Sequence, residues 1–119
     1  MASIVLLIDD DAMFRSLVTE ILRDLGVEQV VDAGTAAAAI DKALHLRPAA
    51  ALVDVGLPDR DGIVLAHELA ALPWRPAVVL TSVDRDAAAR IDSCVDGALP
   101  FVLKDEIVKA PLRRLLELD

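Results

Sequence analysis

Residues 3–14 read SIVLLIDDDAMF, and they join an apolar run directly to three aspartates. The apolar part, residues 4–8, contains only Ile, Val and Leu, which is typical of a parallel strand buried on both faces. Adjacent carboxylates repel one another, so Asp9, Asp10 and Asp11 need water, a basic side chain or a metal ion beside them. The stretch therefore predicts a central strand that ends at a candidate site.

Outside this stretch, short apolar runs alternate with segments of helical spacing along the 119 residues. The expected strands are 4–8, 29–31, 50–53, 77–80 and 99–103, with 29–31 at an edge. The expected helices are 14–25, 35–48, 62–72, 86–94 and one near the C-terminus. Five β/α units in a row predict an α/β domain over residues 1–119, with a doubly wound parallel sheet covered by helices on both faces.

Helix ends are marked by local signals. Asp11 and Thr35 are expected N-caps, and Gly26 is placed where a helix C-terminus favours glycine. The last helix leaves two interpretations open. Either Asp105 caps it and Pro111 kinks it, or it begins near residue 109 with Pro111 in its first turn.

Composition narrows the class of protein. Hydrophobic residues make up 55% of the chain and the net charge is −8, which favours a packed core and disfavours a grip on nucleic acid. The single cysteine, Cys94, cannot form an internal disulfide. Since no apolar run approaches the ~20 residues of a membrane span and no secretory signal is recognisable, we expect a soluble cytoplasmic protein.

The residues that follow each strand carry the candidate chemistry, because ligands of open parallel sheets bind beyond the carboxyl ends of the strands. Asp9 and Asp10 follow the first strand, Asp54 the third, Thr81 the fourth and Lys104 the fifth. Clustered carboxylates suit a hard cation, Mg²⁺ above all. A carboxylate is also a competent phosphoryl acceptor, and a lysine beside it can neutralise the transferred group.

Taken together, these marks resemble the receiver domain of bacterial two-component response regulators. The matching segments are LLIDDD, LVDVGLPDRDG, VVLTS and GALPFVLKDE, in the family's order and spacing. The resemblance covers nearly the whole chain. It implies the flavodoxin-like (βα)5 fold with sheet order 2-1-3-4-5. This order is one of the two common ones among doubly wound sheets, and a receiver protein is a known example of it.

The resemblance also implies a role for each acidic residue. Asp54 would be the phosphoacceptor. Asp9 and Asp10 would hold Mg²⁺ together with Asp54 and the backbone carbonyl of Gly56. The family's receivers are not enzymes in the ordinary sense, because they catalyse only their own aspartyl phosphorylation and dephosphorylation.

Three further positions receive roles by the same resemblance. Thr81 would be the switch hydroxyl, Lys104 would pair with the phosphoryl group, and Phe101 would be the aromatic residue that turns inward when Thr81 moves. Receivers often carry Lys-Pro with a cis bond after the fifth strand. Here Asp105 follows Lys104, where a cis bond costs more than before proline.

The implied partners are a sensor histidine kinase or phosphotransfer protein as phosphoryl donor, with acetyl phosphate as a small-molecule substitute. The phosphorylated form would control an output domain or a partner protein, and LKDE is closer to receivers attached to DNA-binding helix-turn-helix domains. Homodimerisation on phosphorylation is left as one option. Neither direct nucleic-acid binding nor membrane attachment is expected of this domain.

Two alternatives remain open from the sequence. LLIDDD also fits the Asp-x-Asp pattern of a small haloacid-dehalogenase-type phosphatase, with Asp9 as nucleophile and Asp11 as acid/base. A docking-only degenerate receiver is the other alternative, although such proteins usually lack the acidic or lysine residues that are present here. The aspartate that takes the phosphoryl group, Asp54 or Asp9, separates the first alternative from a receiver.

Overall fold

The computed structural model describes residues 3–87 and 99–118. Five parallel strands form one sheet in the order β2-β1-β3-β4-β5, which confirms the expected topology. The strands are β1 (Ile4–Ile8), β2 (Gln29–Ala33), β3 (Ala50–Asp54), β4 (Ala77–Ser82) and β5 (Phe101–Leu103). The helices are α1 (Ala12–Asp24), α2 (Ala36–Leu46), α3 (Gly62–Ala70), the 3-10 turn η1 (Lys104–Glu106) and α5 (Leu112–Leu115).

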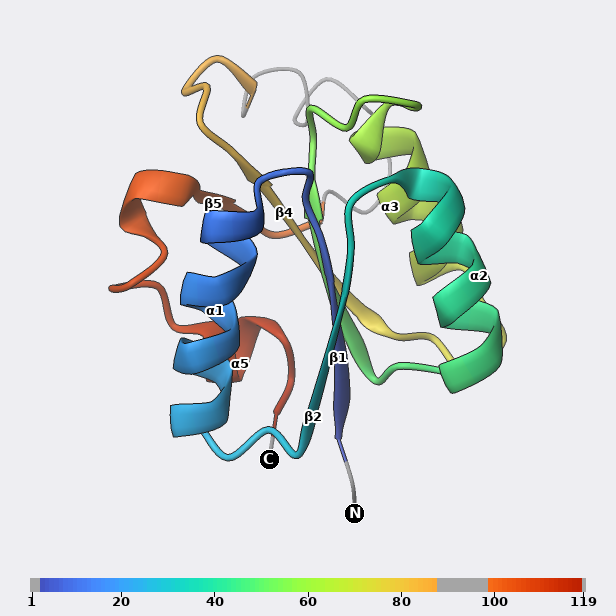
Figure 1. The fold of residues 1–119 in the computed structure, drawn as a ribbon, viewed down its shortest axis with the longest axis horizontal. Helices are drawn as coiled ribbons and strands as arrows, with labels where there is room; N and C mark the ends of the chain where they lie inside the picture. The colour runs from blue at the N-terminus through green and yellow to red at the C-terminus, as the bar shows by residue number, and fades with distance from the viewer. Residues whose placement is uncertain (1–2, 88–98, 119) are drawn as a thin grey trace.

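Helices cover both faces of the sheet (Figure 1). Helices α1 and α5 lie on one face and α2 and α3 on the other. Successive residues of β1 point to opposite faces, so Leu6 and Ile8 belong to the core under α2 and α3 while Val5 and Leu7 belong to the core under α1 and α5. This double burial explains why the central strands read as unbroken apolar runs.

The predicted caps are confirmed. Asp11 accepts hydrogen bonds from Met13 N and Phe14 N at the start of α1, and Gly26 has a φ of +93° just past its end. Thr35 caps α2 through Ala38 N at 3.1 Å. These caps fix where each helix leaves the sheet.

Several expected boundaries were wrong. Strand β2 continues to Ala33, so Asp32 lies within the strand and does not end it. Strands β3 and β4 continue to Asp54 and Ser82, and β5 begins at Phe101 rather than residue 99.

The last helix begins at neither of the two expected positions, residue 105 or residue 109. A 3-10 turn follows β5, and α5 begins only at Leu112, with Pro111 at its N-cap position. The interpretation with Pro111 at the helix start is therefore nearer the structure. No peptide bond in the described residues is cis, so Lys104 and Asp105 are joined in trans. The expected helix 86–94, with Cys94, falls almost entirely outside the described residues.

At the amino ends of β3 and β4, the segment before β4 packs against the turn before β3. Trp74 donates a hydrogen bond from Nε1 to the Pro48 carbonyl at 2.9 Å, and the Arg47 guanidinium lies 4.7 Å from the centre of its ring. These contacts join the turns that lead into β3 and β4. None of the helices in the described segments is long and apolar enough to span a bilayer.

Candidate functional site

The carboxyl ends of β1 and β3 bring three carboxylates together, as the sequence predicts. Asp9, Asp10 and Asp54 each offer an oxygen atom, and these atoms all lie within 4.8 Å of one another. Asp9 and Asp54 are buried, whereas Asp10 is exposed. The site is thus a small acidic cluster with two buried carboxylates and one that faces solvent.

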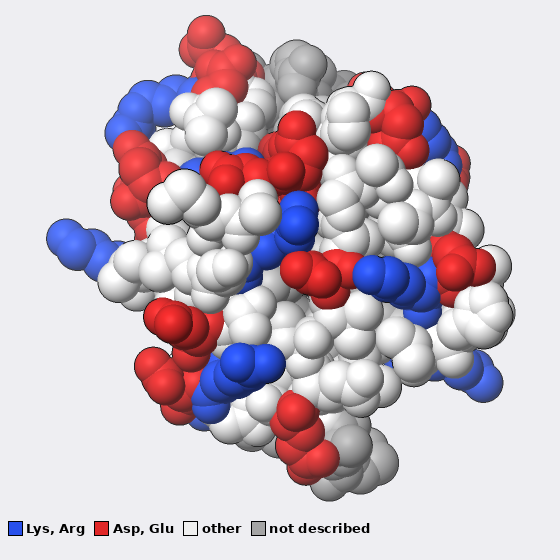
Figure 2. Space-filling view, viewed as in Figure 1, with Lys and Arg blue, Asp and Glu red and all other residues white. Residues whose placement is uncertain are grey.

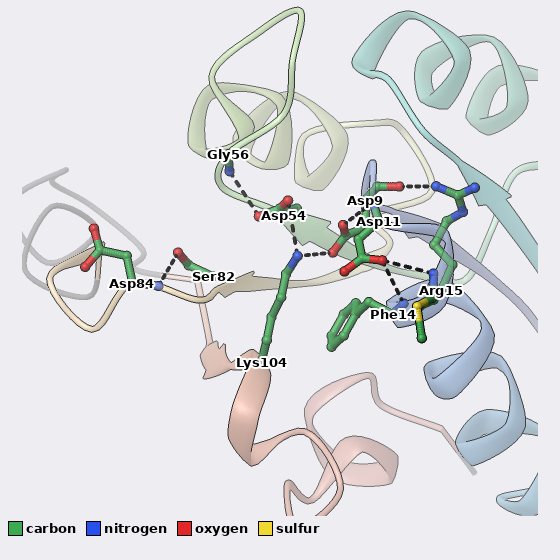
Figure 3. A network of polar contacts seen from close by, with 10 residues as sticks. Asp9, Asp11, Phe14, Arg15, Asp54, Gly56, Ser82, Asp84 and Lys104 are labelled. Atoms are coloured by element: carbon green, nitrogen blue, oxygen red, sulfur yellow. Dashed lines mark hydrogen bonds and ion pairs between the residues drawn. The ribbon is translucent and has the colours of Figure 1, made fainter.

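Lys104 reaches this cluster from the end of β5 (Figure 3). Its Nζ lies 2.6 Å from Asp9 Oδ2 and 3.3 Å from Asp54 Oδ2. Burial favours the neutral amine, but the two carboxylates outweigh it and raise the pKa of Lys104. Burial also raises the pKa of Asp9, against the lowering effect of its contact with Lys104. The lysine therefore stays charged and offsets the repulsion between the aspartates.

Phe14, from the first turn of α1, covers the lysine. The Lys104 ammonium lies 4.7 Å from the centre of the Phe14 ring, within the range of a cation–π contact. The aromatic ring and the two carboxylates hold the ammonium from different sides (Figure 3).

The free lone pairs of the cluster fit a divalent metal ion. Asp9 Oδ2 is buried and accepts no hydrogen bond of ordinary geometry within the described residues, beyond its ion pair with Lys104. The other oxygen, Asp9 Oδ1, is occupied by the Asp11 amide at 2.9 Å. An all-oxygen donor set with one exposed member suits Mg²⁺, which retains several of its water ligands. Asp9, Asp10 and Asp54 are the residues that would hold it.

Gly56 lies beside Asp54, as its expected role requires. The Gly56 amide donates to Asp54 Oδ1 at 3.1 Å. This contact fixes one carboxylate oxygen and leaves Oδ2 directed toward Lys104. The use of the Gly56 carbonyl as a metal ligand stays a prediction.

Thr81 and Phe101 occupy the positions that the sequence suggested. Thr81 is buried in β4 directly beside Asp54 in the sheet register. Phe101 pairs with Leu80 in the register of β4 and β5, and its half-buried ring packs against the core under α2 and α3. Their switch roles stay predictions. Ser82, the next residue after Thr81, uses its hydroxyl to accept the Asp84 amide at 3.0 Å.

Arg15 is a contact of the site that sequence reasoning missed. Its Nη1 donates to the Asp9 carbonyl at 2.5 Å, and its Nε pairs with Asp32 Oδ2 at 3.0 Å. Arg15 thereby ties the turn that carries the aspartates to the edge strand β2. The only sequence signal is a basic residue on the first turns of a helix, which is too common to point to this role.

The loop from β3 to α3, residues 55–61, is held close to the site. Val55 N donates to the Thr81 carbonyl at 2.9 Å, and Gly62 N donates back to the Val55 carbonyl at 3.1 Å. A Cβ at Gly62 would lie 2.0 Å from the Asp54 carbonyl oxygen, so only glycine allows this approach. Asp61 caps α3 by accepting from Ile63 N at 2.8 Å.

Asp59, in the same loop, makes a contact that the sequence did not suggest. Its Oδ1 accepts from Ala36 N at 2.8 Å and its Oδ2 from Ala37 N at 3.1 Å, so it caps a helix 23 residues earlier in the chain. These backbone donors, Ala36 first, hold the pKa of Asp59 below its ordinary value of 3.8. No local sequence pattern distinguishes an aspartate that caps a distant helix from a solvated aspartate in a loop.

The lowered pKa of Asp59 predicts a pH dependence of stability. The folded state favours the ionised carboxylate, so its stabilisation is complete above pH 3.8 and is lost as the pH falls through the lowered pKa. We expect the difference in free energy of unfolding between wild type and Asp59→Asn to be constant from about pH 7 to about pH 5 and to shrink in more acidic solution. Urea unfolding at each pH measures it. A difference that grows on acidification would contradict this assignment.

Charges of both signs are interspersed on the face seen in Figure 2. In that view the acidic side chains lie among basic ones, and the basic side chains that are drawn do not merge into one broad patch. This distribution fits the net charge of −8, and the face in this view presents no basic stripe that would follow a nucleic-acid backbone.

Comparison with known proteins places this geometry in a family. The family model of the response regulator receiver domain matches residues 5–115. A protein-glutamate methylesterase/protein-glutamine glutaminase of Archaeoglobus fulgidus is 33% identical over 103 residues, which are 86% of this chain and 30% of that protein. The transcriptional regulatory protein PdtaR of Mycobacterium tuberculosis is 37% identical over 101 residues, 84% of this chain and 48% of that protein. The chain thus spans less than half the length of either relative.

A solved structure agrees on the fold. The chemotaxis protein CheY4 of Vibrio cholerae superposes with a TM-score of 0.79 at 20% identity, over 98% of this chain and 100% of that one. The sheet order, the helices on both faces and the match of the family model over almost the whole chain agree with one another. The chain belongs to the response regulator receiver domain family, with its flavodoxin-like fold.

Proposed function

We propose that Asp54 accepts a phosphoryl group from a phosphohistidine of a sensor kinase or phosphotransfer protein, in a reaction that depends on Mg²⁺. The observation that carries this proposal is the convergence of Asp9, Asp10 and Asp54 at one edge of the sheet, bridged by the Lys104 ammonium. Three carboxylates and one ammonium supply a nucleophile, a cation site and a fixed positive charge in one place.

The transfer needs little chemistry beyond positioning. An Asp54 carboxylate oxygen attacks phosphorus, the new O–P bond forms, and the P–N bond to the donor imidazole breaks. The donor imidazole, protonated on its other ring nitrogen, keeps the electron pair of that bond and leaves as neutral histidine. When bound, Mg²⁺ neutralises charge on the phosphoryl oxygens. Lys104, 3.3 Å from Asp54 Oδ2, is close enough to pair with the new phosphoryl group.

The proposed switch follows from the new charge. The aspartyl phosphate attracts Lys104 away from Asp9 and draws in the hydroxyl of Thr81, which neighbours Asp54 in the sheet. Movement of Thr81 leaves space for the Phe101 ring, whose strand pairs with β4. The surface near β5 then changes shape and alters contact with an output domain, a partner protein or a second copy of this chain.

Asp54 is a better candidate nucleophile than Asp9. In the phosphatase alternative Asp11 serves as acid/base, yet its Oδ1 accepts from two amides at the start of α1, at 3.0 Å from Met13 N and 3.3 Å from Phe14 N. Asp11 is thus engaged as the cap of α1, with this oxygen directed at the backbone amides of the helix start. Family membership supports the same assignment.

Intact-protein mass spectrometry after incubation with acetyl phosphate and Mg²⁺ tests the assignment. We expect a labile phosphoryl adduct on wild type, none on Asp54→Asn, and a reduced yield on Asp9→Asn because a metal ligand is lost. An adduct that survives Asp54→Asn and vanishes in Asp9→Asn would favour the phosphatase. Absence of the adduct even with phosphorylated kinase as donor would favour the docking-only receiver.

The relatives of this chain differ in their output. The two curated relatives are named for different activities, a methylesterase and a transcriptional regulator, and each is more than twice the length matched here. We propose that this chain supplies the phosphorylation input in the cytoplasm and that catalysis or DNA binding resides elsewhere.

A further inference from the structure

We propose that Asp59 is a positioning residue for the metal site, because it fixes the β3–α3 loop by capping α2. This inference rests on the proposed function, since it concerns Mg²⁺ binding at the acidic cluster. Asp59 does not touch the cluster itself. It acts through the loop that carries Gly56, three residues earlier, whose amide holds Asp54 Oδ1.

Helix α2 offers a rigid anchor for this contact. Its inward face consists of Ala36, Ala39 and Ala43, which are all buried against the sheet. The helix already has its own N-cap in Thr35, which takes Ala38 N. Asp59 accepts hydrogen bonds from the amides of Ala36 and Ala37, so the two caps together satisfy three backbone donors of the first turn. Asp59 thus supplies acceptors for two amides that Thr35 does not reach.

The centre of the loop depends on this contact. Its two ends are fixed by the Val55 amide on Thr81 and by the cap of Asp61 on α3. Between them Gly56 and Pro58 are exposed, and Leu57 is partly buried against the core under α2 and α3.

Two polar side chains tie the loop centre to helices within the described residues. Arg60 pairs with Glu68 on α3 at 2.6 Å, but both groups are solvent-exposed enough for this ion pair to contribute little. Asp59 makes two backbone hydrogen bonds to α2. Pro58 lies directly before it and fixes one backbone angle, so a displacement of Asp59 is passed toward Gly56.

Asp59 therefore supports the acidic cluster indirectly, through the position of Gly56. If Asp59 releases α2, residues 56–58 keep only the apolar contact of Leu57 with the core, and the amide of Gly56 fixes the orientation of the Asp54 carboxylate less firmly. Groups that orient metal ligands typically change metal affinity by 10- to 100-fold when they are removed. We expect about tenfold weaker Mg²⁺ binding from the loss of Asp59, because its effect passes through three residues.

Three variants test this role, with Mg²⁺ alone as the ligand. Asp59→Ala removes both the charge and the hydrogen bonds, Asp59→Asn removes the charge and keeps an acceptor oxygen, and Thr35→Ala removes the other cap of the same helix end. Mg²⁺ titrations are followed by the amide resonance of Gly56 in about 1 M KCl, where screening confines direct charge effects to about 3 Å. Hydrogen exchange of the Gly56 amide is a second measurement that needs no metal.

The proposal expects Asp59→Ala to bind Mg²⁺ about tenfold more weakly and to exchange the Gly56 amide faster. Asp59→Asn should lie nearer to wild type, and Thr35→Ala should bind Mg²⁺ normally although its stability falls. Equal Mg²⁺ affinities for Asp59→Ala, Thr35→Ala and wild type would overturn the proposal, as would equal losses in the two Asp59 variants, which would indicate a charge effect. Wild type that binds no Mg²⁺ and accepts no phosphoryl group would overturn the proposed function as well.

Discussion

Gly62→Ala is expected to lower the free energy of unfolding by about 3 kcal/mol or more. The added Cβ would lie 2.0 Å from the Asp54 carbonyl oxygen and 2.8 Å from the Asp54 carbonyl carbon. Both are backbone atoms of a buried strand, so no side chain can rotate away to relieve the overlap. The start of α3 must shift, and with it the hydrogen bond from Gly62 N to Val55.

Gly56→Ala is the matched control, because it adds the same methyl group to the same loop. There the nearest atom is Asp54 Oδ1 at 3.9 Å, which is an ordinary contact. We expect a change in stability within about 0.5 kcal/mol, as at other exposed positions. Urea unfolding of both variants measures the difference. Similar losses in the two would mean that the loop relaxes freely around Gly62.

Lys104→Met is expected to destabilise the metal-free protein by about 3 kcal/mol, because removal of one partner leaves buried charges without compensation. The ammonium is the cation that lies between Asp9 and Asp54, at 2.6 Å and 3.3 Å. Without it, the pKa of Asp9, already raised by burial, should rise further. Mg²⁺ should stabilise this variant more than wild type, since the metal then replaces the positive charge of the lost ammonium.

Lys109→Met is the control for this change. Lys109 is exposed in the segment after η1 and has the same side chain in a solvated position. We expect its effect to stay within about 0.5 kcal/mol, with or without Mg²⁺. Unfolding in EDTA and then in Mg²⁺ gives both values. If Lys104→Met were as mild as the control in EDTA, the ion pairs with Asp9 and Asp54 would not contribute to stability.

The sequence was sufficient for the sheet and for the residues at its carboxyl ends. Apolar runs that end in Asp9, Asp54 or Lys104 specify both a buried strand and the side chain delivered to the rim. Parallel pairing then brings the ends of neighbouring strands together without any further information. This is why the cluster could be predicted before its distances were known.

Contacts that cross between elements could not be predicted in this way. Asp59 caps a helix from 23 residues away, and Arg15 reaches Asp32 across 17 residues. Each partner follows from the path of a loop or from the angle between a helix and the sheet, and neither is encoded in local periodicity. The late start of α5 at Leu112 has a similar origin, because the 3-10 turn after β5 takes residues that a helical pattern would include.

The position of Trp74 separates two kinds of optical signal. It is the only tryptophan, and its contacts with Pro48 and Arg47 lie at the amino ends of the strands, a full strand length from Asp54. Its fluorescence will therefore follow the integrity of the sheet and remain nearly constant when the charge on Asp54 changes. Emission spectra can thus measure folding in every variant above independently of phosphorylation, and a fluorescent reporter of phosphorylation has to be introduced near β4 or β5.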